Sequence, residues 1–361
     1  MTHPPSLSAP FPYFGGKRRA APIVWNALGD PGGYVEPFAG SAAVLLGRPK
    51  VKGRRVETIN DADGWLVNMW RAIKLSPADV AAHAAGPVSE VDYHARLAWL
   101  QERRNDGLVS WLEGNPEAHD AKAAGWWLYV AACGIGDPWG GGPWRVIDDR
   151  LVDTRAMPGR ESTDSPPGVG ANRELPHLGN AGQGVHRELP HLGNAGRGVH
   201  RALPHLGDAG RGEHQAQLTD YMLRLAWRLE RVRITCGSWE RVVQPSVMRA
   251  KAGGDGSVAV FLDPPYATSG DLYAGTTDSA VALAVAEWCA TAPTDLRIVL
   301  CGYDDEHDRL VARGWRKADG KSGGGAGYST DRLAGRRERL WMSPACVGYA
   351  DDMLDFGEAT A

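Results

Sequence analysis

Short apolar runs alternate along the chain with longer segments in which apolar residues recur every three or four positions. The runs are rich in β-branched residues, which is typical of buried strands, and they lie at 232–236, 258–262 and 296–301. The longer segments predict helices at 63–74, 91–112, 125–133, 218–229 and 279–290. This alternation predicts an α/β fold with a mostly parallel sheet and helices on both faces.

The same pattern divides the chain into segments. Strand runs are confined to 10–75 and 218–345, which we expect to form one α/β domain. From 76 to 172 the apolar pattern is mostly helical and predicts a helical lobe. Residues 346–361 form an acidic tail.

Three near-identical copies of a fourteen-residue unit occupy 173–214, each close to Arg-Glu-Leu-Pro-His-Leu-Gly-Asn-Ala-Gly-Arg-Gly-Val-His. The proline and three glycines of a copy exclude a long helix, and its few apolar residues cannot form a core. The histidine spacing matches no familiar zinc module. We therefore expect a flexible insertion that arose by duplication, in which the extra copies act as a spacer.

The run 258–262 ends in Asp263-Pro264-Pro265-Tyr266, which predicts a rigid exit from the sheet because two prolines cannot continue a strand. Open α/β sheets bind their ligands at the carboxyl ends of strands, where this corner would lie. Asp263 and the Pro264 carbonyl can accept hydrogen bonds from an amino group on a flat ring. Tyr266 can stack on that ring. The alternative is a strand-terminating turn without a role in binding.

Other segments suit a nucleotide site. A glycine-rich segment that ends in Gly16 and Lys17 precedes a short strand, and the strand leads into Glu36-Pro37-Phe38-Ala39-Gly40 and an apolar helix. Gly40 permits close approach of the backbone to a ligand. Asp61 comes about twenty residues later, after another strand, where an acidic residue can bind ribose hydroxyls.

In this order, the segments Tyr-Phe-Gly-Gly-Lys, Tyr-Val-Glu-Pro-Phe-Ala-Gly-Ser, Ile-Asn-Asp-Ala-Asp and Asp-Pro-Pro-Tyr resemble the Dam-type (D12 class) adenine-N6 DNA methyltransferases. The segment 337–341, Arg-Glu-Arg-Leu-Trp, resembles the last strand of phage-encoded members. The resemblance covers roughly 10–75 and 218–345. One departure is Tyr13, where the Dam enzyme has a tryptophan, so an aromatic ring is retained.

The resemblance implies the class I S-adenosylmethionine-dependent methyltransferase fold, with seven strands of which the last is antiparallel. It implies S-adenosylmethionine as the cofactor and no metal, and it places target recognition in the lobe at 76–172. The implied cofactor-binding residues are Tyr13, Gly16, Lys17, Glu36, Phe38, Gly40, Asp61 and Asp263.

The implied reaction adds a methyl group to N6 of adenine, a poor nucleophile because its lone pair is delocalised into the ring. Hydrogen bonds to Asp263 and the Pro264 carbonyl would restore density to that lone pair, and alignment with the sulfonium would supply much of the rate. A target adenine inside a duplex has to be flipped out, and Tyr266 would stack on it. These three residues are therefore the predicted catalytic residues.

Double-stranded DNA is the expected partner. The basic stretch 309–341 includes a glycine-rich loop, and Lys321, Arg332 and Arg336 could contact phosphates there. Trp139 and Trp144 follow the lobe and could stack on displaced bases, and their alternative is to pack against the lobe. The sequence is compatible with a monomer and specifies neither the recognition sequence nor a cognate endonuclease.

Composition narrows the alternatives. The net charge of −3 means that contact with DNA would depend on local charge. Five scattered cysteines argue against disulfides or a zinc site. The N-terminal segment lacks the apolar core of a signal peptide and no apolar run is long enough to cross a bilayer, so we expect a cytoplasmic protein. Two other functions stay open. One is methyl transfer to cytosine N4, RNA adenine or a protein glutamine, and the other is an inactive DNA-binding or antirestriction protein that keeps the fold.

Overall fold

The structure is a computed structural model of the chain. It describes the residues 7–11, 13, 16–49, 53, 55–86, 89–104, 107–133, 144–147, 150–153, 212–249, 256–265, 278–320 and 337–347. Among the helices of these segments, none is long and apolar enough to cross a membrane.

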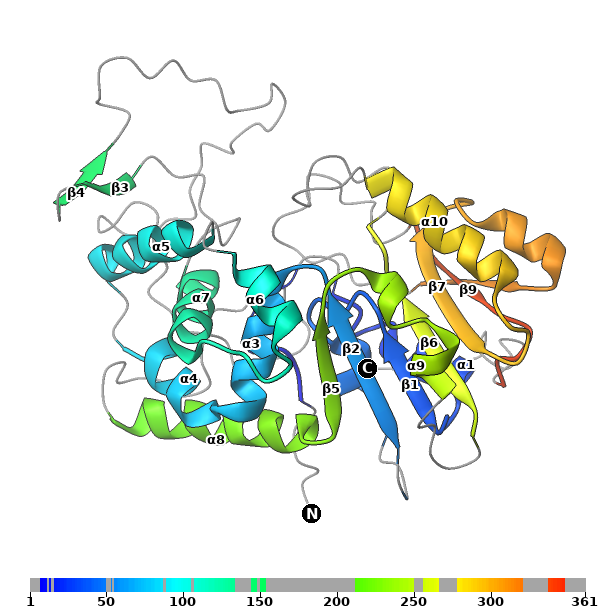
Figure 1. Ribbon diagram of the computed structural model, residues 1–361, viewed down its shortest axis with the longest axis horizontal. Coiled ribbons are helices and arrows are strands. Elements are labelled where there is room, and N and C mark those ends of the chain that lie inside the picture. Colours follow the sequence, from blue (N-terminus) through cyan, green and yellow to red (C-terminus); the bar gives the residue numbers. More distant parts are fainter. Residues whose placement is uncertain are drawn as a thin grey trace, which may run out of the picture.

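A seven-stranded sheet forms the centre of the molecule, with the strand order β5-β2-β1-β6-β7-β9-β8 (Figure 1). Its strands are β1 (Gly33–Glu36), β2 (Val56–Asp61), β5 (Val232–Cys236), β6 (Val258–Leu262), β7 (Arg297–Tyr303), β8 (Arg316–Asp319) and β9 (Glu338–Met342). The strands from β5 to β7 pair in parallel, and β9 is antiparallel to both of its neighbours. The predicted mostly parallel sheet, with its last strand antiparallel, is confirmed.

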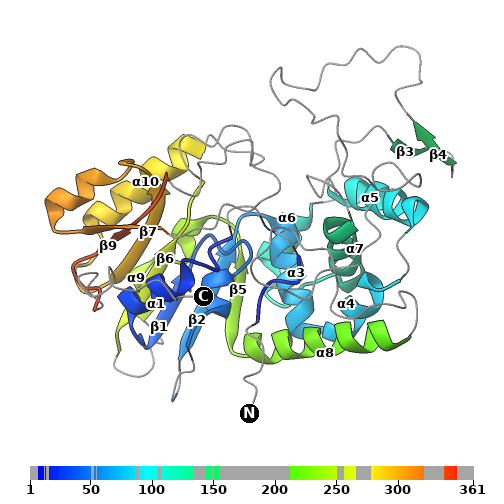
Figure 2. The ribbon, with the colours of Figure 1, turned by 180° about the vertical axis from the view of Figure 1, so that it is seen from behind.

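Both faces of the sheet are covered, as the alternation of side chains along β6 illustrates. Phe261 packs into one hydrophobic cluster, whereas Val260 and Leu262 pack into a second cluster on the opposite face. The first cluster includes residues of α1 (Ala21–Leu28), α2 (Ala43–Leu46) and α3 (Gly64–Leu75). The second includes residues of η2 (Trp239–Arg241), α9 (Pro245–Arg249), α10 (Asp278–Thr291) and the 3₁₀ helix η3 (Asp308–Arg313). The views from opposite sides show this layering (Figures 1 and 2).

The predicted helical lobe contains α4 (Pro77–Ala84), α5 (Glu90–Arg104), α6 (Leu108–Gly114) and α7 (Ala121–Cys133). It also carries an antiparallel hairpin of β3 (Trp144–Ile147) and β4 (Arg150–Asp153), which the helical pattern did not predict. The hairpin lies beside α5 in both views (Figures 1 and 2).

Helix α8 (Gly212–Leu229) runs beneath α3 and α4 and ends beside β5 (Figure 1). Its predicted start at 218 was late, because Gly212 to His214 lie in the third sequence repeat. The buried side chains Leu218, Met222 and Leu225 recur at helical spacing and fix α8 against the lobe. Helix α8 therefore joins the lobe to the sheet.

Two other boundaries differ from the pattern-based prediction. The single helix expected at 91–112 is two helices, and Gly107, with a φ of 72°, stands directly before α6. The expected acidic tail is fixed at its start, because the Val347 N–H donates to the Ala27 carbonyl at 2.9 Å and Cys346 is buried.

Candidate active site

The strand order of the sheet reverses between β1 and β6. From β1 the chain continues to β2 on one side, and from β6 it continues to β7 on the other. The crevice at such a reversal, outside the carboxyl ends of the strands, is where open α/β sheets bind ligands. Glu36 is the last residue of β1 and Asp263 directly follows β6. The two strongest sequence motifs therefore meet at this reversal.

Lys17 places its ammonium between two carboxylates. Its Nζ lies 2.8 Å from Asp263 Oδ2 and 2.9 Å from Glu338 Oε1. The side chains of Lys17 and Glu338 are buried, whereas that of Asp263 retains 20% of its surface. Burial disfavours a charged Lys17, but the carboxylates outweigh this effect and raise the pKa of Lys17 above its ordinary value. Asp263 therefore has a fixed cationic partner and still has surface with which to meet a ligand.

Glu338 is the residue of this cluster that the sequence analysis missed. It opens β9, where it pairs with Tyr303 of β7. The sequence analysis counted it only within the basic stretch 309–341, where it lies between Arg337 and Arg339. The available signal was an acidic residue two positions before the apolar run that begins at Leu340.

Asp263, Cys301 and Glu338 offer ligand atoms that all lie within 4.8 Å of one another, which would suit a metal ion by distance alone. However, the Lys17 ammonium already bridges the two carboxylates. Burial also raises the pKa of the Cys301 thiol well above its ordinary value, so the thiolate that binds metals is disfavoured. The thiol instead hydrogen-bonds with Asp263. The cation of this cluster is thus the protein's own lysine.

The predicted cofactor residues Tyr13, Gly16 and Gly40 lie together. Gly40 has a φ of +47°, and a Cβ at this position would lie 2.6 Å from the Tyr13 ring. A Cβ on Gly16 would meet the Tyr13 carbonyl oxygen at 3.4 Å. The Gly40 carbonyl accepts a hydrogen bond from Trp70 Nε1 at 2.9 Å. The glycine therefore lets an aromatic ring pack directly on the turn after β1.

Asp61 is tied to the same turn. Its Oδ2 accepts from the Gly40 N–H at 2.9 Å, and its Oδ1 accepts from the Asp63 N–H at 2.9 Å. Burial, together with the negative charge of Asp63, raises the pKa of Asp61 to about 6 despite these hydrogen bonds. Next to it, the Asn60 amide donates to the carbonyls of Pro37 and Gly237. The loops after β1, β2 and β5 are thus joined at the carboxyl edge of the sheet.

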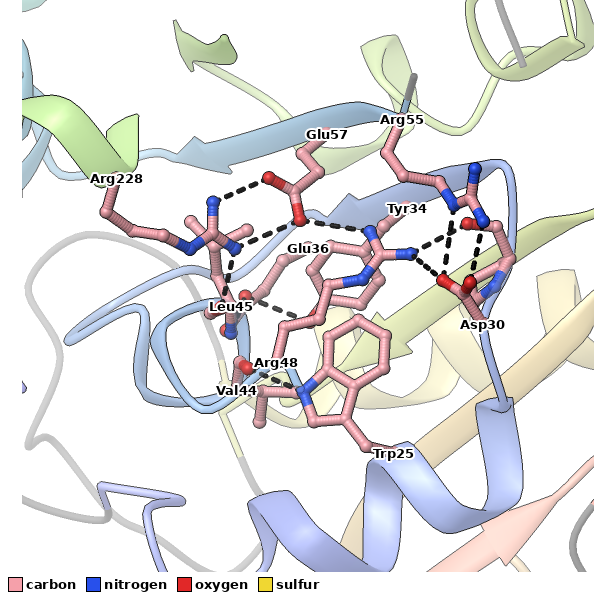
Figure 3. Close-up of polar contacts among 11 residues, drawn as sticks. Trp25, Asp30, Tyr34, Glu36, Val44, Leu45, Arg48, Arg55, Glu57 and Arg228 are labelled. Atoms are coloured by element: carbon pink, nitrogen blue, oxygen red, sulfur yellow. Dashed lines mark hydrogen bonds and ion pairs between the residues drawn. The ribbon is translucent and has the colours of Figure 1, made fainter. Parts of the chain in front are cut away.

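Glu36 is turned into the protein (Figure 3). Its Oε2 accepts from the Tyr34 hydroxyl at 3.0 Å and from the Leu45 N–H at 3.2 Å. Burial is the main reason that its pKa is raised to about 8, against the opposing effect of these hydrogen bonds. In this structure Glu36 fixes α2 behind the turn, so its predicted contact with a cofactor remains a prediction.

A network of ion pairs lies next to Glu36 (Figure 3). Glu57 accepts from Arg48 Nη1 at 3.0 Å and from Arg228 Nη1 at 2.7 Å. Arg228 also donates to the Leu45 carbonyl at 2.8 Å, and Arg48 reaches Asp30 at 3.1 Å. This network anchors α2 and α8 to β2 and so helps to hold the turn after β1 in place.

Phe38 is half-buried and belongs to an aromatic group that the sequence analysis did not identify. Its ring centroid lies 6.1 Å from that of Trp239, with an angle of 31° between the ring planes. Trp239 in turn contacts Trp288 edge-on at 6.2 Å. A cluster of aromatic rings therefore borders the turn after β1.

Of the predicted catalytic residues, Asp263 and Pro264 are described and Tyr266 lies outside the described residues. The predicted DNA contacts Trp139, Lys321, Arg332 and Arg336 also lie outside them. The backbone of Trp144 opens β3, but its side chain is not described. Residues 173–211 of the repeats fall outside as well.

Contacts between described residues bring six of the predicted site residues together at one edge of the sheet, namely Tyr13, Gly16, Lys17, Gly40, Asp61 and Asp263. A scan against models of known protein families and a search of curated proteins found no match to this chain.

Proposed function

We propose that this protein is an S-adenosylmethionine-dependent DNA methyltransferase that methylates N6 of a flipped-out adenine, with the class I methyltransferase fold. The observation that carries the proposal is the Lys17–Asp263 ion pair at the reversal of strand order. It joins the first and the last of the four motifs that resemble the Dam-type enzymes. A strand-terminating turn without a role in binding would not require a buried cationic partner for Asp263.

The described residues fit the proposed cofactor in chemistry as well as in position. Asp61 ends β2, next to β1, where a carboxylate can accept hydrogen bonds from ribose hydroxyls. Lys17, Asp263 and Glu338 together carry one more negative than positive charge, which suits a cationic ligand. When bound, S-adenosylmethionine would supply a methyl group on such a cation, a sulfonium.

Asp263 and Pro264 would act on the amino group of the adenine. The carboxylate and the Pro264 carbonyl accept hydrogen bonds from the two N6–H groups, which draws the nitrogen lone pair out of conjugation with the ring. After transfer, N6 has one proton to lose, and the Asp263 carboxylate is a suitable acceptor. Lys17 holds this carboxylate in one orientation, so the amino group is positioned rather than merely attracted.

The lobe is the proposed DNA reader, and the cations of its described part lie among aromatic rings. Lys122 Nζ is 4.7 Å from the Trp99 ring and 4.3 Å from the Trp126 ring. Arg103 lies 4.8 Å from Trp99, and Arg96 lies 3.8 Å from Tyr129. Tyr129 is buried, whereas Trp99 and Trp126 are partly exposed. Cations can neutralise phosphates and the partly exposed tryptophans can stack on unpaired bases, so this surface of α5 and α7 suits a DNA backbone near a displaced base.

The test is transfer of a radiolabelled methyl group from S-adenosylmethionine to unmethylated DNA by the full chain, followed by digestion and chromatography of the nucleosides. We expect the label to appear only in N6-methyl-2′-deoxyadenosine. Label in N4-methylcytosine, or transfer only to RNA or to a glutamine peptide, would instead identify one of the related methyltransferases. DNA binding without any transfer would indicate an inactive DNA-binding protein.

A further inference from the structure

Glu338 contacts the same ammonium as Asp263, although it comes from a strand at the other end of the sequence. Oε1 of Glu338 lies 2.9 Å from Lys17 Nζ, and the Glu338 side chain is only 3% exposed. It therefore meets Lys17 from inside the protein, whereas Asp263 meets it from the side of the crevice.

The sheet holds Glu338 in place. Its backbone carbonyl accepts from the Gly320 N–H at 2.9 Å, and a Cβ on Gly320 would lie 2.9 Å from Cγ of Glu338. A side chain at position 320 would therefore displace that of Glu338. Neighbouring arginines have acidic partners of their own, since Arg337 pairs with Asp304 at 2.6 Å and Arg339 with Asp319 at 3.4 Å.

A single ammonium bound to Asp263 alone would neutralise this carboxylate and weaken it as a hydrogen-bond acceptor. A second carboxylate on the same ammonium shares the positive charge. It also fixes the position of Nζ, because the two carboxylates together define where the cation lies. Together, the two effects keep the Asp263 carboxylate in one orientation and leave it anionic.

We propose that Glu338 is a positioning residue of the methyl transfer: it holds the Lys17 ammonium and shares its charge, so that Asp263 is fixed in orientation and remains an anionic acceptor for the N6 amino group. This inference rests on the proposed function. It adds a residue that acts through Lys17 and does not contact the substrate.

Glu338→Gln tests the charge, because glutamine has the same shape and its carbonyl can still accept from Lys17. Glu338→Asp keeps the charge and shortens the side chain by one methylene. Asp319→Asn is the matched control, since it removes a carboxylate that is 83% exposed and pairs with Arg339 of the same strand. Each full-length variant is compared with the wild type for kcat, KM for S-adenosylmethionine and thermal unfolding.

For Glu338→Gln we expect kcat to fall by roughly ten- to hundredfold, as for other losses of electrostatic positioning, with less than about a threefold change in KM. Glu338→Asp should recover part of kcat, and Asp319→Asn should match the wild type. If Glu338→Gln does not fold, Glu338→Asp still tests the role of Glu338. It should lower kcat and change KM by less than about threefold.

A Glu338→Gln variant with wild-type kcat would overturn the role of Glu338 and leave the proposed function intact. So would a folded Glu338→Asp variant with wild-type kcat, or a loss that appears in KM alone. A wild-type protein that transfers no methyl group to adenine would overturn the proposed function, and the role of Glu338 with it.

Discussion

The backbone N–H of Gly40 donates a hydrogen bond to Asp61 at 2.9 Å, which joins the turn after β1 to the end of β2. Gly40 reaches this position with a φ of +47° and with the Tyr13 ring where a Cβ would otherwise be. The three residues come from separate motifs of the sequence. Their contact is the physical reason that a glycine occupies position 40.

Gly40→Ala should therefore destabilise the fold at this turn. Strain at positive φ costs about 1 kcal/mol for alanine, and displacement of the Tyr13 ring adds to it, so we expect a loss of about 2–3 kcal/mol in the free energy of unfolding. Chemical denaturation measures this loss. Gly107→Ala is the control, because Gly107 has a φ of +72° with no atom within 4 Å of the added Cβ. Equal losses in the two variants would contradict the Tyr13 contact.

Glu57→Gln should destabilise the network of Figure 3. Arg48 and Arg228 would each lose a buried carboxylate, and breaking such a pair leaves an uncompensated charge. We expect a loss of roughly 3 kcal/mol, at the low end for buried pairs, because Arg48 keeps its contact with Asp30. Urea unfolding measures the loss. Asp319→Asn, which removes an exposed carboxylate, should have little effect, and a similarly small effect of Glu57→Gln would show that the network does not stabilise the fold.

Glu36 should make the protein less stable as the pH rises. Its pKa is raised from 4.5 to about 8 in the folded chain, so the folded state holds a proton that the unfolded state has already lost between these values. The stability that this group contributes is present below pH 4.5 and is lost by about pH 8, at up to about 1.4 kcal/mol per pH unit.

Glu36→Gln removes this titration. Relative to the wild type, the variant should gain stability steadily from pH 5.5 to pH 8 in thermal or urea unfolding. Glu287→Gln, at an exposed position on α10, is the control and should track the wild type. A constant difference between Glu36→Gln and the wild type across this range would mean that Glu36 is not held protonated.

Much of the fold was predictable because its main elements obey simple patterns. The strand 258–262 has the bounds of β6, since an apolar run closed by two prolines can hardly end elsewhere. Helix α1 was not predicted, because eight residues with a proline near the start give too short a pattern. Strand β8 was missed for another reason: it is an edge strand whose side chains are mostly exposed, so no alternation of apolar residues marks it.

The site was predictable where the backbone restricts which residues fit. Gly40 has a positive φ, and Asp263 precedes the two prolines that end β6. Glu338 could not be predicted as a site residue, because its role depends on β9 lying beside β7, and the local sequence does not determine the strand order. The inward orientation of Glu36 was hidden for a similar reason. It depends on the Tyr34 hydroxyl and the Leu45 N–H, which only the folded turn brings together.

The expectation that the extra repeat copies act as a spacer can be tested by deletion. Deletion of one copy, residues 187–200, shortens a glycine- and proline-containing segment by one unit and changes the loop-closure free energy by less than about 1 kcal/mol. We expect an unchanged melting temperature, within about 2 °C, and unchanged methylation. Deletion of the same number of residues from α8, at 215–228, removes the buried Leu218, Met222 and Leu225 and should prevent folding. A copy that is needed for folding or for methylation would not be a spacer.

Nucleoside analysis of DNA treated with the wild type and with Asp263→Asn probes the proposed chemistry at its reacting atoms. Asparagine keeps the shape of the side chain and removes the anionic acceptor that Lys17 orients. We expect N6-methyladenine with the wild type, at least a hundredfold less with Asp263→Asn, and binding of S-adenosylmethionine by both proteins in calorimetry. Equal methylation by the two proteins, or none by a wild type that binds the cofactor, would show that Asp263 does not activate an adenine amino group.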